Sequence, residues 1–456
     1  MRVLIVNHLA AQHLGGSELS MLGLVANWRQ HHPDLEAHVL SPAPGTAMER
    51  AALAEGWSAS VAPYGGWVSF RERETAARRR LERSRAREYV DAILTVLDEV
   101  RPDLVVLNTV VTPWAAVAAR ERQIPVAWFI REFVVDRPGF RLREGRDATL
   151  HAVDELADLL FTNSLAVRDS IADVIRRDRV EVAHPVIDLD AVQRAIAHRT
   201  PAPAPREPLR IGLLGRVTPE KGQRTAIAAL ALLHARGVDA RLDIIGGVIL
   251  PGFDLELRRL AHHAGIADRV RLVGERSRPL EHLARTDVSL VSSPREAFGR
   301  VTLESLALGM PVIASTEGGA PELVEHGTSG FLVDTTDPGA IAHAVARYAS
   351  DRALLATHGD AATLRAAAVL SGPFAATATV ALLDELVARG PSAGPAPQAL
   401  FTVPPVSTVG RLALEIGDAV ATMAQRIARL IRDPKPPVQR RWRSLRRRVQ
   451  RRDRRG

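Results

Sequence analysis

Residues 293–322 read SPREAFGRVTLESLALGMPVIASTEGGAPE. The apolar residues Val288–Val291 just before them predict a short buried strand, which a Ser-Ser-Pro break ends. Gly299 then predicts the start of a helix, and the apolar run at 311–315 predicts a second strand that leads into the pair Gly318-Gly319. We therefore expect strand, loop, helix, strand and glycine loop, which is the repeating unit of a parallel α/β sheet.

Two glutamates in this stretch, Glu296 and Glu304, are separated by seven residues. A helix that begins at Gly299 would present its free backbone N–H groups and its dipole to an anion. A carboxylate beside that helix start cannot bind phosphate, but it can accept hydrogen bonds from ribose or sugar hydroxyls. The stretch therefore predicts a nucleotide-sugar site, with the diphosphate on the backbone and the hydroxyls on the glutamates.

The length of 456 residues favours two domains and an additional segment. A hydrophobic content of 46% and a charged content of 25% are typical of a globular protein with an ample core. The absence of cysteine excludes disulfides, thiolate metal sites and a cysteine nucleophile, and it fits a reducing cytoplasm. The N-terminus predicts a strand rather than a signal peptide, and no apolar run approaches the ~18 residues that span a membrane. We expect a cytoplasmic protein.

Positive charge is concentrated at the C-terminus. Residues 435–456 contain eleven Lys and Arg and one Asp, a net charge of +10, whereas the whole chain carries +8. Residues 1–434 therefore carry −2, and the basic isoelectric point near 10.7 describes the tail alone.

The first residues repeat the strand, loop and helix pattern. Residues 2–7 predict a buried strand, and the following loop ends in Gly15-Gly16-Ser17. We expect Ser17 to cap a helix over Glu18–Trp28. A glycine loop between strand and helix lets the backbone approach a phosphate or sugar, although a simple tight turn is the alternative.

Strands and helices alternate through the rest of the chain. Strands are predicted at 37–40, 104–107, 126–130, 159–162, 209–217, 241–247, 269–275, 288–293 and 311–315. Helices are predicted at 47–55, 86–100, 341–348 and 375–388, and a further helix is predicted to end at about 236. This pattern predicts an N-terminal doubly wound, Rossmann-like domain over 1–197, a proline-rich linker over 198–208 and a second such domain over 209–390. A ligand is expected in the cleft between the two domains.

The chain beyond residue 390 differs in character. Residues 391–407 predict a Pro/Ala linker, and residues 408–456 predict an amphipathic helix followed by the arginine-rich tail. That composition favours an anchor on an anionic membrane surface, with nucleic acid, or no specific partner, as alternatives. The mixed run Arg71–Glu88 is typical of a solvated helix face.

Gly215-Arg216 and Lys221 place two cations around another predicted helix start. Arg and Lys there would neutralise a departing diphosphate when a glycosidic bond to phosphate breaks. Two solvated side chains in a loop are the alternative for either residue alone. Their combination with Glu296, Glu304 and the glycine loops favours a functional site.

The second half of the chain resembles the C-terminal domain of the retaining glycosyltransferases of the GT-B fold, family 4 type. The segments that carry the resemblance, in the family's order, are GRVTPEKG (215–222), IIGG (244–247), SPREAFGRVTLESLALGMPVIAS (293–315) and GGAPELVEHGTSGFLV (318–333). The first half is similar more loosely, through GGSE (15–18), LNT (107–109) and TNS (162–164). Residues beyond about 390 fall outside the resemblance.

The resemblance implies roles for individual residues. Arg216 and Lys221 would stabilise the leaving diphosphate, Glu296 would face the donor sugar, and Arg131 would lie near the reacting carbon. Donor binding would involve Gly15, Gly16, Gly215, Gly246, Gly274, Phe298, Gly299, Arg300, Val301, Thr302 and Glu304. It also implies transfer with retention of configuration from a nucleotide diphosphate sugar, without a cofactor or bound metal, to a glycan or lipid-linked acceptor in the cell envelope.

One position departs from the family pattern. Many relatives carry a histidine where this chain has Arg131, within Ile130-Arg131-Glu132. Arginine stays protonated and cannot act as a base, although it can orient a sugar or phosphate oxygen. The departure leaves open a catalytically degenerate, membrane-recruited scaffold that binds nucleotide-sugar, and, more weakly, a sugar epimerase.

Two further patterns predict no site. Asp188-Leu189-Asp190 matches a metal-binding D-x-D pattern, but its place at the domain edge favours helix capping. The histidines show no zinc-binding helix motif, and His13, the histidine placed nearest the expected cleft, is expected to be exposed. We predict no metal.

Overall fold

The computed structural model describes residues 1–8, 11–69, 74–135, 140–200, 204 and 207–392, together with 414–415, 418–419 and 423. Nearly all of the predicted Pro/Ala linker and C-terminal extension, 391–456, therefore lies outside the described residues.

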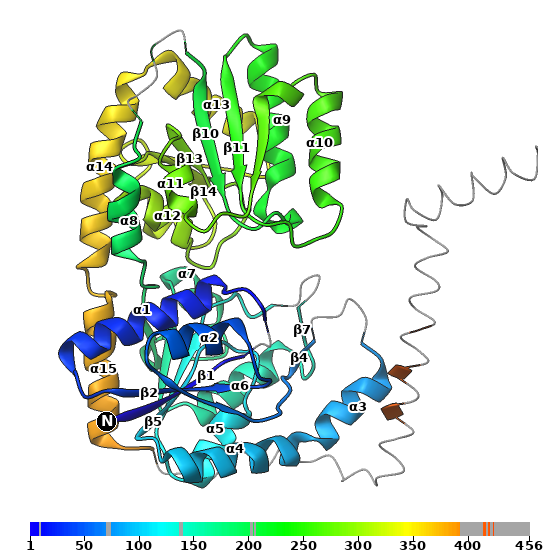
Figure 1. The fold of residues 1–456 in the computed structure, drawn as a ribbon, viewed down its shortest axis with the longest axis vertical. Coiled ribbons are helices and arrows are strands. Elements are labelled where there is room, and N and C mark those ends of the chain that lie inside the picture. The colour runs from blue at the N-terminus through cyan, green and yellow to red at the C-terminus, as the bar shows by residue number, and fades with distance from the viewer. Residues whose placement is uncertain are drawn as a thin grey trace, which may run out of the picture.

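The first half of the chain forms a parallel seven-stranded sheet in the order β3-β2-β1-β5-β6-β8-β9 (Figure 1). Its elements are β1 (Arg2–Val6), α1 (Gly16–His31), β2 (Glu36–Ser41), α2 (Ala47–Ala54), β3 (Ser58–Val61), α3 (Ala76–Ser84), α4 (Ala86–Val100), β5 (Leu104–Leu107), α5 (Trp114–Glu121), β6 (Val126–Ile130), α6 (Arg146–Leu156), β8 (Leu159–Thr162), α7 (Leu165–Ser170), β9 (Val180–Val182) and α8 (Leu189–Ile196). Strands β4 (Val68–Ser69) and β7 (Arg141–Leu142) form a separate antiparallel pair.

The second half forms a parallel six-stranded sheet in the order β12-β11-β10-β13-β14-β15. Its elements are β10 (Leu209–Leu214), α9 (Gln223–Ala235), β11 (Ala240–Ile245), α10 (Phe253–His263), β12 (Val270–Gly274), α11 (Pro279–Leu283), β13 (Val288–Leu290), α12 (Arg300–Ala307), β14 (Val312–Ser315), β15 (Gly330–Val333), α13 (Pro338–Ser350), α14 (Ala353–Leu370) and α15 (Ala376–Arg389). Both halves are doubly wound, as predicted.

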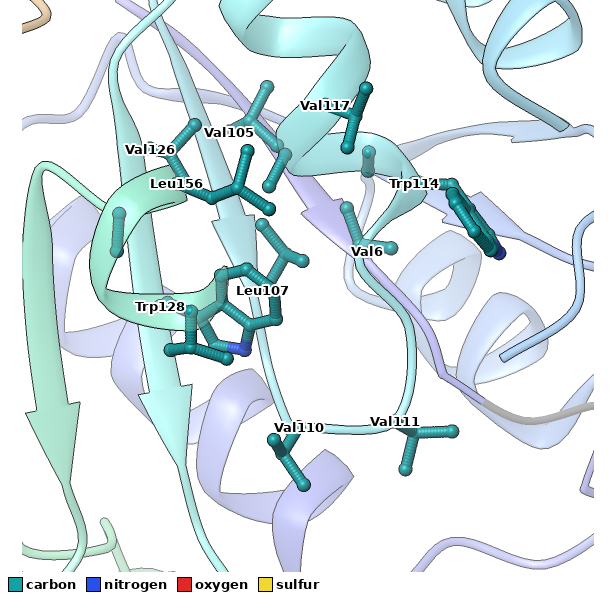
Figure 2. Close-up of a cluster of buried hydrophobic side chains, with 14 of the residues drawn as sticks. Val6, Val105, Leu107, Val110, Val111, Trp114, Val117, Val126, Trp128 and Leu156 are labelled. Carbon is teal, nitrogen blue, oxygen red and sulfur yellow. The ribbon is translucent and has the colours of Figure 1, made fainter. Parts of the chain in front are cut away.

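Both faces of each sheet are buried, which explains why the strands read as apolar runs rather than alternating ones. In β1, Leu4 and Val6 join a core cluster with α4 and α5, whereas Val3 and Ile5 join a second cluster with α1 and α2 on the opposite face. Figure 2 shows the first cluster, where Trp128 of β6 and Trp114 of α5 pack among valines and leucines.

Two details differ from the sequence expectations. The first helix begins at Gly16 and its N-cap is Gly15, so the prediction of Ser17 as the cap is wrong. The Gly15 N–H donates to the Glu18 carboxylate at 3.0 Å, and with this side-chain cap the helix begins two residues earlier than expected.

The last helix also lies elsewhere than expected. Sequence analysis grouped 375–388 with the second domain, but α15 packs on α1 of the first (Figure 1). Trp28 Nε1 donates to Asp384 Oδ1 at 2.9 Å, and Val380, Leu383 and Leu386 enter the first domain's core. Helix α14 still packs against α12 of the second domain, so the chain crosses back between the two helices.

Candidate functional site

The carboxyl ends of the two sheets meet each other. Ser164 Oγ, which follows β8, donates to Ala297 O at 2.6 Å, and the Glu322 carboxylate accepts from the N–H groups of Leu165 and Ala166 at 2.9 and 2.8 Å. The guanidinium carbon of Arg295 lies 3.5 Å from the centroid of the Phe133 ring. Because ligands of parallel α/β sheets bind beyond the carboxyl ends of the strands, the loops at these facing edges are the candidate site.

On the second domain, Lys221 and Glu296 form an ion pair. Lys221 Nζ lies 2.6 Å from Glu296 Oε1, and Ser293 Oγ donates to the same oxygen at 2.6 Å. Burial opposes ionisation of Glu296, but Lys221, Ser293 and Arg216 outweigh it and lower the pKa of this carboxyl. Glu296 is therefore an anion at neutral pH and accepts hydrogen bonds only.

Arg216 is an exposed cation at the carboxyl edge of the second sheet. Its side chain is exposed and, within the described residues, makes neither a hydrogen bond nor an ion pair. Its carbonyl accepts from Gln223 Nε2 at 2.9 Å, which anchors the loop while the guanidinium stays available. Arg216 and Lys221 thus come together beside Glu296, as the sequence analysis predicted for this cluster.

Glycines let the edge loops pack backbone against backbone. A Cβ on Gly246 would lie 2.0 Å from Gly215 O, and one on Gly318 would lie 2.2 Å from Glu296 O. The sequence analysis assigned Gly215 and Gly246 to donor binding. Gly215 and Gly246 also have a structural role, because their close contact lets the loops after β10 and β11 pack together.

The start of α12 lies at this edge. Gly299 is its N-cap with φ 95°, and the helix begins at Arg300, as predicted. The Phe298 ring is buried against His184, with ring centroids 4.9 Å apart, so only its backbone can face a ligand. Thr302 is also buried, and its Oγ1 has no hydrogen-bond partner within the described residues; Val301 is half-buried.

Arg300 links Glu304 to the first domain. Its Nη2 donates to Glu304 Oε1 at 2.9 Å, and its Nη1 donates to Gly16 O at 3.3 Å. Burial raises the pKa of Glu304, Arg300 partly offsets this, and Asp188 adds to it. Glu296 and Glu304 therefore lie at one edge but in opposite electrostatic settings.

Gly274 ends β12, the edge strand of the second sheet, with φ 80°. Its carbonyl accepts from Gly246 N at 3.0 Å, so it belongs to the same row of loops. On the first domain, Gly15 and Gly16 open α1 and meet this row through Arg300.

The first domain presents Arg131 after β6. Its Nε donates to Asn108 Oδ1 at 2.7 Å, and Asn108 Nδ2 in turn donates to Ser17 O at 3.0 Å. Burial lowers the pKa of Arg131 to about 10, with Glu132 and Glu18 opposing the shift and Arg300 adding to it. Arg131 therefore remains a cation at neutral pH. Glu132 holds the loop by accepting from the N–H groups of Val110 and Arg131, each at 3.0 Å.

Sequence analysis missed His8. It lies two residues after the end of β1, its side chain is 8% exposed, and its Nε2 lies 3.5 Å from Glu18 Oε1. Its place after a central parallel strand was the available signal, whereas the analysis weighed His13. His13 is exposed, as expected.

The Asp188-Leu189-Asp190 pattern has a structural role. Asp188 Oδ1 accepts from Ala191 N at 2.8 Å and caps α8, which confirms the capping prediction. No group of three or more His, Asp or Glu in the described ranges could hold a metal ion. Among the helices that the structure describes, none is both long and apolar enough to cross a membrane.

Part of the chain is similar in sequence to known proteins. Residues 196–365 match the family model for glycosyl transferases group 1. The D-inositol 3-phosphate glycosyltransferase of Streptomyces avermitilis is 33% identical over 224 residues, 46% of this chain and 48% of the relative. The GDP-mannose-dependent alpha-(1-6)-phosphatidylinositol monomannoside mannosyltransferase of Mycobacterium tuberculosis is 37% identical over 172 residues, 33% of this chain and 44% of the relative. The chain thus matches about half the length of these curated relatives.

The structural likeness extends over both domains. The crystal structure of Anabaena Alr3699/HepE in complex with UDP-glucose superposes with a TM-score of 0.66 and 21% identity, over 85% of this chain and 100% of that one. At that identity the match shows the fold alone. Residues 196–365 are therefore similar to the glycosyl transferases group 1 family, and the chain has the GT-B fold.

Proposed function

We propose that this protein is a retaining, metal-independent glycosyltransferase. It would move a sugar from a nucleotide diphosphate sugar to a polysaccharide or lipid-linked acceptor in cell-envelope glycan synthesis. The family match of the second domain supports the class of reaction, and the phosphatidylinositol monomannoside in the name of one relative supports a lipid-linked acceptor.

The single observation that carries the proposal is the pair of cations at the carboxyl edge of the second sheet. Lys221 is fixed by Glu296, and Arg216 is exposed without a partner in the described part of the chain. Two preorganised cations stabilise the negative charge that develops on a diphosphate when its bond to the sugar breaks. They do so without a metal ion.

The carboxylates supply recognition rather than leaving-group stabilisation. Glu296, kept ionised, would accept hydrogen bonds from donor sugar hydroxyls, and Glu304 would accept them from the ribose. The N–H groups at the start of α12 would face the phosphates. In the reaction the bond from the anomeric carbon to the diphosphate breaks, a bond to the acceptor oxygen forms, and the hydroxyl proton leaves the acceptor.

The test uses the full chain and a panel of UDP-, GDP- and ADP-sugars. We expect slow hydrolysis of one donor by wild type, and a loss of about 100-fold in Lys221→Met and Arg216→Met. Arg224→Met is the matched control, because Arg224 lies nearby in α9 but pairs with Glu256 on the exposed surface. With an acceptor alcohol present, NMR of the glycoside product reports its anomeric configuration, and retention is expected.

Saturable binding of a donor with no turnover, even with acceptors added, would instead identify a catalytically degenerate scaffold. Turnover with equal rates in wild type and both cation variants would overturn the assigned roles of Arg216 and Lys221. Activity that depends on added divalent metal and vanishes with chelator would overturn the metal-independent mechanism.

We also propose that residues 408–456 hold the protein on the cytoplasmic face of an anionic membrane, because their net positive charge and apolar helix pattern fit that surface. Nucleic acid is the less favoured partner. Full-length protein should co-sediment with vesicles rich in phosphatidylserine, and a chain truncated after Pro405 should not. Equal binding by both chains would contradict the anchor.

A further inference from the structure

His8 lies at the carboxyl edge of the first sheet in a setting that the proposed roles do not yet use. It follows β1, the third strand in the sheet order, and its side chain is more than nine-tenths buried. Its Nε2 lies 3.5 Å from Glu18 Oε1, whereas its Nδ1 is buried and has no hydrogen-bond partner in the part of the chain that the structure describes. A buried polar atom without a partner calls for an explanation.

The carboxylate of Glu18 favours a proton on Nε2, the ring nitrogen that lies 3.5 Å from it. Its other oxygen, Oε2, is held by the Gly15 N–H at 3.0 Å and by Ser17 Oγ at 2.9 Å, so Oε1 is fixed in place. A proton on His8 Nε2 can point at this anion, which leaves Nδ1 with a lone pair. A histidine oriented by a carboxylate in this way is an effective proton acceptor at its other nitrogen.

The surroundings of His8 belong to the candidate site. Ser17 O accepts from Asn108, whose Oδ1 holds Arg131, so the loops after β1, β5 and β6 form one cluster. The same β1–α1 loop touches the second domain, because Gly16 O accepts from Arg300 of α12. His8 therefore lies on the first-domain side of the edge that faces the start of α12.

We propose that His8 is a catalytic residue whose Nδ1 accepts the proton of the attacking hydroxyl, an inference that rests on the proposed glycosyltransferase function. The acceptor oxygen bonds to the anomeric carbon on the face from which the diphosphate departs, as retention requires. The diphosphate keeps the electron pair of the broken bond, and the hydroxyl proton moves to His8 Nδ1. The resulting imidazolium is stabilised by Glu18 and then returns its proton to solvent. Water can replace the acceptor, which gives donor hydrolysis.

The charges around His8 suit this role. Burial lowers the pKa of His8, Glu18 opposes the shift, and Arg131 adds to it, so the ring is neutral at neutral pH. Only the neutral ring accepts a proton, so the reaction rate should fall as the pH falls through this lowered pKa. Replacing the Glu18 carboxylate by an amide removes the group that raises the pKa and should move the acid limb to still lower pH.

The experiment measures the pH dependence of donor hydrolysis and the Kd of the hydrolysed donor in wild type and in His8 variants. His8→Asn keeps a hydrogen-bonding group near the position of Nδ1, and His8→Gln keeps one near Nε2, but neither amide accepts a proton. We expect both to lose about 100-fold in rate and to lose the acid limb, with the donor Kd unchanged. His13→Gln, which alters an exposed histidine of the same loop, should match wild type.

The outcomes separate the two proposals. A wild-type enzyme that hydrolyses a donor while His8→Asn retains the full rate and the acid limb overturns the role of His8 alone. A wild type that turns over no donor overturns the proposed function and this inference with it. Loss of rate with a lost acid limb and intact donor binding supports the role of His8, since a purely structural histidine would not set the pH profile.

Discussion

The two facing edges of the molecule are built in different ways. On the second domain, loops pack backbone to backbone through glycines, and the cations Lys221 and Arg216 remain half-buried or exposed. On the first domain, side-chain contacts hold the loops together instead. His8, Glu18, Asn108 and Arg131 form one enclosed cluster. A backbone-built edge is recognisable from glycine spacing, whereas a side-chain-built edge leaves no such pattern in the sequence.

The largest expected effect on stability comes from the backbone-built edge. Gly246→Ala should lower the free energy of unfolding by about 3 kcal/mol, because the new Cβ would lie 2.0 Å from Gly215 O at a positive φ of 148°. Gly252→Ala is the matched control, since Gly252 also has a positive φ, of 87°, but nothing lies within 4 Å of its Cβ position. We expect a loss of about 1 kcal/mol there. Equal losses in urea unfolding would show that loop contact does not shape this edge.

The second-largest loss of stability is expected at the side-chain-built edge of the first domain. Arg131→Met should lower the free energy of unfolding by about 2 kcal/mol, because it removes the charged donor to Asn108 and a cation near Glu18 and Glu132. Arg122→Met removes a surface ion pair with Asp98 and should leave the urea midpoint as in wild type. An Arg131 variant as stable as the Arg122 variant would mean that the first-domain cluster does not depend on this side chain.

The smallest effect distinguishes the two glutamates. The lowered pKa of Glu296 means that its ionised form stabilises the fold above the ordinary value of 4.5 and that this contribution is lost as the pH falls. The raised pKa of Glu304 has the opposite sign, because its contribution is present below 4.5 and is lost as the pH rises through the folded-state pKa.

The measurement compares Glu296→Gln and Glu304→Gln with wild type by urea unfolding at about pH 7 and about pH 3.5. The stability advantage of wild type over Glu296→Gln should shrink as the pH is lowered, whereas its advantage over Glu304→Gln should grow. Parallel changes in the two variants would contradict the opposite settings of the two carboxylates.

Much of the fold was predictable, because both sheets are buried on both faces. The run 126–130 and the run 159–162 were placed at the residues that β6 and β8 occupy. The start of α12 after Gly299 was predicted as well, since a glycine there permits the left-handed backbone that ends the loop. The start of α1 was predicted wrongly, because the glycine at position 15 caps the helix through a carboxylate three residues on.

The candidate site was only partly predictable. Lys221 and Glu296 are 75 residues apart, and their spacing alone does not imply the 2.6 Å contact between them. His8 was missed because its place after β1, the signal that the sequence offered, does not show which side chains it meets. Its partner Glu18 lies in the first turn of α1, and its neighbour Arg131 follows β6.

The sequence by itself determined the two parallel α/β domains, the positions of most strands, and the glycine and charge pattern that marks the second domain. Local periodicity and backbone conformation carry that information along the chain. Only the tertiary structure decided that α15 returns to the first domain, that the pKa values of Glu296 and Glu304 shift in opposite directions, and that His8 lies with Glu18 and Arg131 at the facing edge. Burial and charge pairing depend on residues distant in sequence, and folding brings them within a few ångströms.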